Sequence, residues 1–265
     1  MVNKPVIGVA AAVVVVALSV AYYLHSRSSH PPRAPAAAQS APPAPPAEPA
    51  IQHPVPPAAG AGSKGPLPSL GDSDPAIRDA LGEVAGSNAV AQYLVPDSII
   101  RHIVVTIDNL PRQKVPVDKR PIVAVAGTFV ALGDELHATL DPKNFTRYEP
   151  MIGVLRNLDM QRLAEVYLRF YPLFQQVYQN LGYPNGYFND RLVQVIDSLL
   201  ATPQPAGPIE LTRPNVMFTY ADPTLEARPA GQKLLLRMGP NNAAVVKTKL
   251  TELRAIITAA PPPKQ

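Results

Sequence analysis

The chain has no cysteine among its 265 residues. This absence excludes a disulfide framework and any metal site built from thiolates. It fits a protein of the cell envelope, where a chain without thiols forms no stray disulfides, although cytosolic domains also lack cysteine. The absence of cysteine therefore excludes two kinds of chemistry, but it does not decide in which cell compartment the protein lies.

The signature motifs of several enzyme classes are also missing. The sequence has no GxSxG elbow, P-loop, GxGxxG fingerprint or HExxH motif. Beyond residue 67 only His102 and His137 occur, so a serine–histidine–acid triad has few candidates. Glu135, His137 and Asp141 are metal-ligand types, but a solvent-exposed strand pair gives the same pattern. We expect no metal and no cofactor, and a binding protein rather than an enzyme.

Positive charge is slight in the part of the chain that we expect to fold. The sequence has 24 Lys and Arg against 20 Asp and Glu, but four of these cations and one acid precede residue 67. The near-neutral remainder argues against a nucleic-acid-binding surface. Residues 234–250 resemble a helix-hairpin-helix motif without its second glycine, so a helical-hairpin contact with nucleic acid is the last alternative.

The stretch 5–24, PVIGVAAAVVVVALSVAYYL, has no charged residue and follows a short tail, 1–4. A helix of this length spans a hydrocarbon core of about 30 Å, so we interpret it as a transmembrane anchor in contact with the lipid bilayer. A small-x-small triplet at 19–21 leaves a cleaved signal peptide as the alternative. The flanking cations do not decide the side on which the remainder lies.

Residues 25–66 are dominated by proline and alanine. Thirteen of the 38 residues from 31 to 68 are proline. Such a chain buries little apolar area and favours extended polyproline II, so we expect a disordered linker with a reach of at most roughly 120 Å. A globular domain should follow at 67–258, and a disordered tail at 259–265.

Helical periodicity dominates residues 67–258. Two hairpins are predicted, one over 128–140 with Gly133-Asp134 as a two-residue turn, and one from 209–212 and 216–220. The predicted fold class is mainly α (α+β): a single helical domain with one or two small antiparallel β-hairpins, after an N-terminal transmembrane helix and a proline-rich linker. Helices are expected near 73–86, 96–109, 148–158, 159–181, 189–202, 223–228, 229–238 and 240–258.

The longest periodic run, 159–181, is the expected centre of the core. Asp159 should cap it, and aromatic residues including Phe174 fall on one stripe. Pro172 lacks the backbone N–H that the helix needs, so we expect a kink or a split there.

A turn at 183–191, YPNGYFNDR, concentrates tyrosines beside amide and charged groups. Asn185-Gly186 favours a tight turn with positive φ, and Asn189 should cap the following helix. Tyrosine faces beside polar groups suit a sugar or peptide groove, whereas the alternative is a packed turn whose hydroxyls bond locally. The candidate ligand-binding residues are Tyr183, Tyr187, Asn189, Asp190 and Arg191.

The same helix carries Asp190 and Asp197, seven residues apart and on one side. Paired carboxylates can act as acid and base on a glycosidic bond. An envelope hydrolase that acts on a glycan with carboxylates near Asp190 is therefore the second hypothesis. A carboxylate in the first turn and an ordinary solvated acid explain the pair without catalysis, and we assign no catalytic residue.

The connector 111–121, PRQKVPVDKRP, carries four cations against one acid. Its prolines exclude a continuing helix. It is either a solvated connector or a contact point for anionic headgroups or wall carboxylates. The candidate residues for this contact are Arg112, Lys114, Lys119 and Arg120.

Three separated motifs resemble one bacterial family, catalogued as domain of unknown function 3014. They are LVPDSIIRHIVVTIDNLPRQKVP, LGYPNGYFNDRLVQVIDSLLATP and FTYADPTLEARPAGQKLLLRMGPNNA, and the resemblance covers about 67–258. It implies an anchored, single-pass protein of the Gram-negative inner (cytoplasmic) membrane with its domain in the periplasm. It implies no activity and no site residues. Our first hypothesis is thus a periplasmic binding or scaffold domain for an envelope protein or for peptidoglycan.

Overall fold

The computed structural model describes residues 50–55, 65–134 and 137–259. All of them belong to one compact unit, 48–265. The predicted anchor at 5–24 and most of the predicted linker lie outside the described residues. Within the described ranges, no helix is long and apolar enough to cross a membrane.

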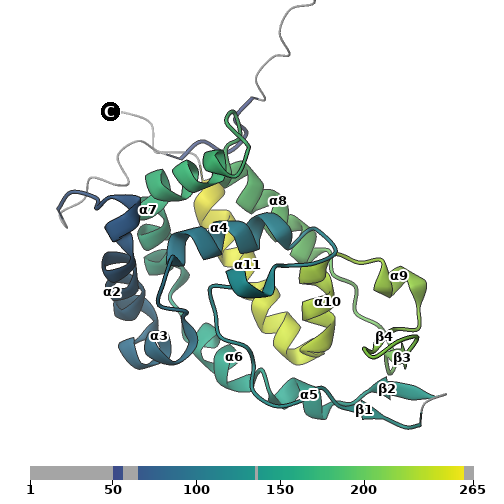
Figure 1. The fold of residues 1–265 in the computed structure, drawn as a ribbon. Helices are drawn as coiled ribbons and strands as arrows, with labels where there is room; N and C mark the ends of the chain where they lie inside the picture. Colours follow the sequence, from purple (N-terminus) through teal and green to yellow (C-terminus); the bar gives the residue numbers. More distant parts are fainter. Residues whose placement is uncertain (1–49, 56–64, 135–136, 260–265) are drawn as a thin grey trace, which may run out of the picture. The chain divides into compact units, whose positions relative to one another are not determined.

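The described chain is mainly helical with one small sheet, as the sequence predicted (Figure 1). Two short 3₁₀ helices, η1 (Leu70–Asp72) and η2 (Val117–Lys119), accompany the longer elements. The α-helices are α2 (Ser73–Ala85), α3 (Ser87–Tyr93), α4 (Ile99–Asn109), α5 (Lys143–Thr146), α6 (Glu149–Arg156), α7 (Met160–Asn180), α8 (Phe188–Leu200), α9 (Pro223–Glu226), α10 (Ala230–Arg237) and α11 (Pro240–Thr258). The strands are β1 (Ala131–Leu132), β2 (Ala138–Leu140), β3 (Glu210–Thr212) and β4 (Thr219–Tyr220).

The four strands form one antiparallel sheet in the order β1-β2-β3-β4. The two predicted hairpins are both present, and the pairing of Ala138 with Leu211 joins them. Sequence periodicity did not indicate this junction, because it links strands on either side of four helices. Leu140, Leu211 and Tyr220 bury a small core between the sheet and α10.

The predicted turn of the first hairpin is wrong. Leu132 pairs with Thr139, so Gly133-Asp134 is only the start of a longer connection and not a complete two-residue turn. Gly133 has φ 102°, and a Cβ there would lie 2.3 Å from the carbonyl oxygen of His137. The glycine therefore serves a close backbone approach within that longer connection.

Helix α7 is the centre of the main core, as predicted. Phe170 and Val177 are fully buried, and the cluster around them draws on α2, α4, α7 and α8. Asp159 caps the helix by accepting hydrogen bonds from the N–H groups of Gln161 and Arg162. Of the kink or split expected at Pro172, the split does not occur, since α7 is continuous across the proline. Buried side chains on both sides of the proline hold one helix against its neighbours, and this packing outweighs one lost hydrogen bond.

Gly239 shows why α10 and α11 can meet in a tight corner. Its φ is +84°, and an added Cβ would lie 2.5 Å from the ring of Phe145. Gly86 has a similar φ, +88°, but nothing lies within 4 Å of its Cβ position.

We predict that Gly86→Ala lowers the free energy of unfolding by about 1–2 kcal/mol through backbone strain alone. Gly239→Ala should cost about 1–3 kcal/mol more than that, because its added methyl group also overpacks the site. Urea denaturation of both variants measures the difference, and equal losses would contradict it.

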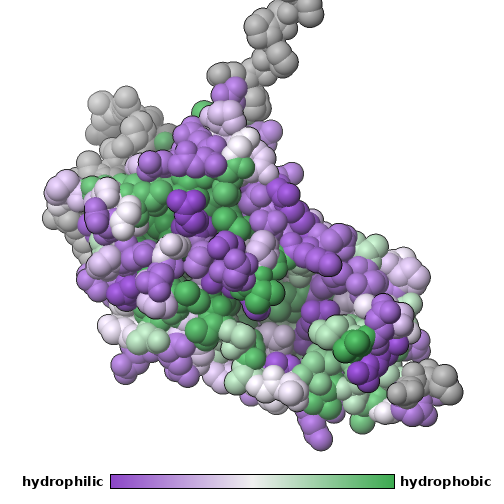
Figure 2. Space-filling view, viewed as in Figure 1, coloured by the Kyte–Doolittle hydropathy of each residue, from purple (hydrophilic) through white to green (hydrophobic). Residues whose placement is uncertain are grey.

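Hydrophobic side chains are exposed around the sheet. Val216 is 77 % exposed, Met217 76 % and Leu132 58 %. Figure 2 shows green surface in this region and also over the helical part. Exposed apolar side chains are thus found at the sheet as well as on the helices.

Candidate functional site

The turn between α7 and α8 stacks two tyrosine rings. Tyr178 and Tyr183 have ring centroids 4.7 Å apart and planes 21° apart. The N–H of Gly186 donates to the carbonyl of Tyr183 at 2.9 Å. Gly186 does not have the predicted positive φ. Glycine is needed there because a Cβ would lie 2.8 Å from the Tyr178 ring.

Beside this turn lies a polar cavity of about 400 Å³. Four of the five predicted site residues line it: Tyr183, Tyr187, Asp190 and Arg191. The remaining lining residues are Ala50, Gln52, Asp108, Tyr178, Asn185 and Gln194. We call this cavity and the adjoining surface that contacts residues 50–55 the tyrosine groove.

Asp108 is a buried carboxylate at the base of the tyrosine groove. Its Oδ1 accepts from Arg191 Nε at 3.1 Å, and its Oδ2 accepts from an Arg112 guanidinium nitrogen at 2.7 Å. Arg112 also donates to the hydroxyl of Tyr183 at 2.7 Å. The Asp108 carboxylate raises the pKa of Arg112. The network ties α4 to the turn and to α8.

Asp108 was missed at the sequence level although a signal existed. It follows Ile100 and Val104 at intervals of four, on the buried stripe of α4. A carboxylate in such a position needs a cationic partner, and Arg191 supplies one.

Residues 50–55, which belong to the predicted proline-rich linker, lie in the tyrosine groove. The backbone N–H of Gln52 donates to Asp190 Oδ2 at 3.0 Å, and that of His53 donates to Asp190 Oδ1 at 2.7 Å. The N–H of Val55 donates to the Tyr187 hydroxyl at 2.6 Å. Residues that the sequence assigned to a disordered linker therefore lie against the domain, in the groove that the sequence pointed to.

The prediction that Asn189 caps the helix is wrong. Tyr187 occupies the N-cap position of α8, and Asn189 is fully buried in the first turn. Its side-chain N–H groups donate to the carbonyls of His53 at 2.9 Å and Ile257 at 3.1 Å, while its oxygen accepts from Tyr167 at 2.9 Å. Burial raises the pKa of Tyr167 well above its usual range, which keeps that hydroxyl a donor.

The four predicted anionic-surface residues have different surroundings. Arg112 turns into the Asp108 network, and Lys119 pairs with Asp118 at 3.0 Å. Arg120 donates to the carbonyl of Val117 at 3.1 Å, and Lys114 is exposed. Arg112 therefore belongs to the network around Asp108, and the other three lie in the connector.

The two carboxylates of α8 have different partners. Asp190 binds the backbone of 52 and 53, whereas Asp197 accepts from Arg254 at 2.6 and 3.1 Å. The hydrogen bond from Arg254 lowers the pKa of Asp197. An acid held ionised in this way is a poor proton donor for glycosidic cleavage.

The metal-ligand types noted in the first hairpin are not fully placed, because Glu135 lies outside the described residues. His137 is exposed and lies 3.4 Å from Asp134. Among the residues that the structure describes, no group of three or more His, Cys, Asp and Glu is placed to hold a metal ion.

A comparison with family profiles finds a match over residues 99–254, to the family described as "Protein of unknown function (DUF3014)". The match covers more than half of the chain, from α4 into α11. It includes Asp108, the tyrosine turn and α8, and it leaves out 50–55. No curated protein and no solved structure matches the chain.

Proposed function

The chain belongs to the DUF3014 family, and from this premise we propose that its domain is a binding module for extended, proline-containing peptide segments. The tyrosine groove is the binding site. The segment 50–55 is its occupant in cis, and a partner segment of the same backbone pattern is its occupant in trans.

The observation that carries this proposal is that the groove binds a main chain. Three N–H groups, those of residues 52, 53 and 55, donate to Asp190 and Tyr187. The carbonyl of residue 53 accepts from Asn189. Residue 54 is a proline and has no N–H to donate. The pattern of donors thus accommodates proline at 54 and disfavours it at 52, 53 and 55.

The side chains of residues 50–55 differ in how far they contact the domain. Ile51 is 55 % exposed, while Val55 packs against the main core cluster. Recognition therefore depends on an extended backbone and one apolar side chain, in the way that proline-rich and extended peptides bind aromatic grooves. The unfilled cavity beside Ala50 and Gln52 gives a partner room for larger side chains against Tyr183 and Arg191.

We place this module in the cell envelope. The apolar stretch 5–24 supports an anchor in the inner membrane, and the family resemblance supports a periplasmic domain. The segment that Asp190, Tyr187 and Asn189 bind is a proline-containing stretch of the protein's own main chain, which supports a proline-rich protein of the envelope as the partner. The hydrolase and the nucleic-acid contact are not proposed.

The test is a titration with a labelled peptide of residues 48–57, EPAIQHPVPP. It should bind a chain whose residues 50–55 are replaced by Gly-Ser repeats, and should bind the unaltered chain roughly hundredfold more weakly, because the cis segment competes at a millimolar effective concentration. In the replaced chain, Asp190→Asn should weaken binding about tenfold or more, since two charge-assisted hydrogen bonds are lost. Asp197→Asn, on the same helix but bonded to Arg254, is the matched control and should leave binding unchanged.

The peptide itself supplies the sharper control. Proline in place of His53 removes a required N–H and should abolish binding, whereas Pro54→Ala removes no donor and should retain it. If both peptides bind alike, or if the chain with the replaced segment binds neither, the groove does not recognise a peptide backbone.

A further inference from the structure

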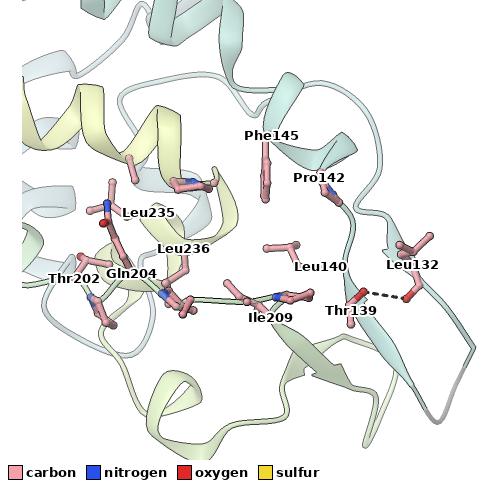
Figure 3. A pocket seen from close by; sticks show the side chains of 18 of the residues that line it. Leu132, Thr139, Leu140, Pro142, Phe145, Thr202, Gln204, Ile209, Leu235 and Leu236 are labelled. Carbon is pink, nitrogen blue, oxygen red and sulfur yellow. Dashed lines mark hydrogen bonds between the residues drawn. The ribbon is translucent and has the colours of Figure 1, made fainter.

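A second cavity, of about 440 Å³, lies between the sheet and the hairpin formed by α10 and α11. It is separate from the tyrosine groove and shares no lining residue with it. Figure 3 shows Leu140, Phe145, Ile209 and Leu236 around the same space, contributed by β2, α5, the strand entry before β3, and α10. Its volume falls within the range of small-molecule sites.

The lining is mostly apolar. Prolines, leucines, Phe145 and Ile209 make most of it, and no acidic residue lines it. The polar lining residues are Thr139, Thr202, Gln204 and Lys247. Lys247 is the only charged member of this lining.

Lys247 is held at the rim by the loop that follows α8. Its Nζ donates to the carbonyl of Thr202 at 2.6 Å. A lysine ammonium has three donors, and no acidic side chain of the described residues forms an ion pair with this one. The cavity thus has mostly hydrocarbon walls and one cation that no acidic side chain of the described residues neutralises.

We propose that this cavity binds a free single-chain carboxylate amphiphile of the fatty-acid class, with its carboxylate on Lys247 and its hydrocarbon tail between Leu140, Phe145 and Leu236. Charge complementarity selects the anionic head, and burial of methylenes against the apolar walls provides the main driving force. A peptide fits less well, since the apolar lining leaves peptide N–H and C=O groups without partners.

The full chain is tested in its membrane with two photoreactive probes, a diazirine-bearing pentadecanoic acid and the corresponding alcohol. Mass spectrometry of the crosslinked peptides should place both probes on 202–209 and 235–247. Lys247→Met should lower labelling by the acid about tenfold, the scale of one charge-assisted hydrogen bond, and should leave labelling by the alcohol unchanged. Lys247→Arg should restore labelling by the acid.

Two further variants separate the binding role from a structural one. Lys249 lies on the same helix, donates to the carbonyl of Leu158 at 3.0 Å and pairs with Glu252 at 3.1 Å. Lys249→Met therefore removes a lysine bound to a backbone carbonyl outside the lining of the cavity, and should change neither probe. Ile209→Trp fills the cavity and should lower labelling by both. Equal loss of both probes in Lys247→Met, labelling outside 202–209 and 235–247, or labelling of the cavity by a diacyl phospholipid probe instead of the acid would overturn the proposal.

Discussion

Phe174→Ala should lower the free energy of unfolding by about 3–5 kcal/mol, the usual cost of removing a buried phenyl ring. Phe174 is 4 % exposed, and its ring stacks on that of Phe188 at 5.8 Å with planes 15° apart. The ring centroid of Tyr167 lies 5.6 Å from that of Phe174. The cavity left by alanine would lie where α7, α8 and α4 meet, and continuous helices cannot collapse into it. Urea denaturation followed by circular dichroism measures the loss.

Phe129→Ala provides the comparison, because it removes the same atoms from a surface position. Phe129 is 37 % exposed and packs mainly on Phe218. Phe129→Ala should lower the free energy of unfolding by less than half as much as Phe174→Ala does. Comparable losses would mean that the core is not centred on α7.

Asp108→Ala should destabilise by about 3 kcal/mol or more, because a buried ion pair that loses one partner leaves an uncompensated charge. The charge left behind is that of Arg191, whose side chain is 18 % exposed and which donates to both the carboxylate and the backbone carbonyl of residue 108. Arg112, at 51 % exposed, can return to water. Thermal and urea denaturation measure the effect, and binding of the 48–57 peptide should fall with it.

Two controls test whether the effect of Asp108→Ala comes from its pairing with Arg191. Asp118→Ala removes an exposed carboxylate paired with Lys119 and should leave the free energy of unfolding nearly unchanged. The double replacement of Asp108 and Arg191 by alanine should be less destabilising than the sum of the two single replacements. A sum that is simply additive would show that the pair is not coupled.

Local patterns were sufficient to predict most helices. The Asp159 cap, the α7 stripe and the boundary at Gly86 all depend on residues within a few positions of each other. The β2–β3 pairing and the continuity of α7 at Pro172 depend on distant neighbours, so periodicity could not supply them. The turn of the first hairpin was predicted wrongly for a related reason: Gly133-Asp134 matched a two-residue turn by composition, but the partner strand starts further on.

The sequence predicted most residues of the candidate site, but it did not predict which other segments contact them. Tyr183, Tyr187, Asp190 and Arg191 do converge, because a single turn brings them together. Asp108 comes from another helix, and the segment 50–55 comes from a stretch whose composition indicated disorder. No local rule shows that three N–H groups of such a stretch will find acceptors on α8.

The side chain of Asn189 joins residue 53, near the start of the described chain, to residue 257, near its end. A pulling force on the N-terminal side would therefore load the hydrogen bonds at the first turn of α8 before it reached η1 and α2. These bonds would break one after another as 50–55 peeled away, while α7 and its neighbours stayed folded. Single-molecule stretching from the N-terminus should accordingly show a small early release of chain ahead of unfolding, and Asp190→Asn should lower the force at which it occurs.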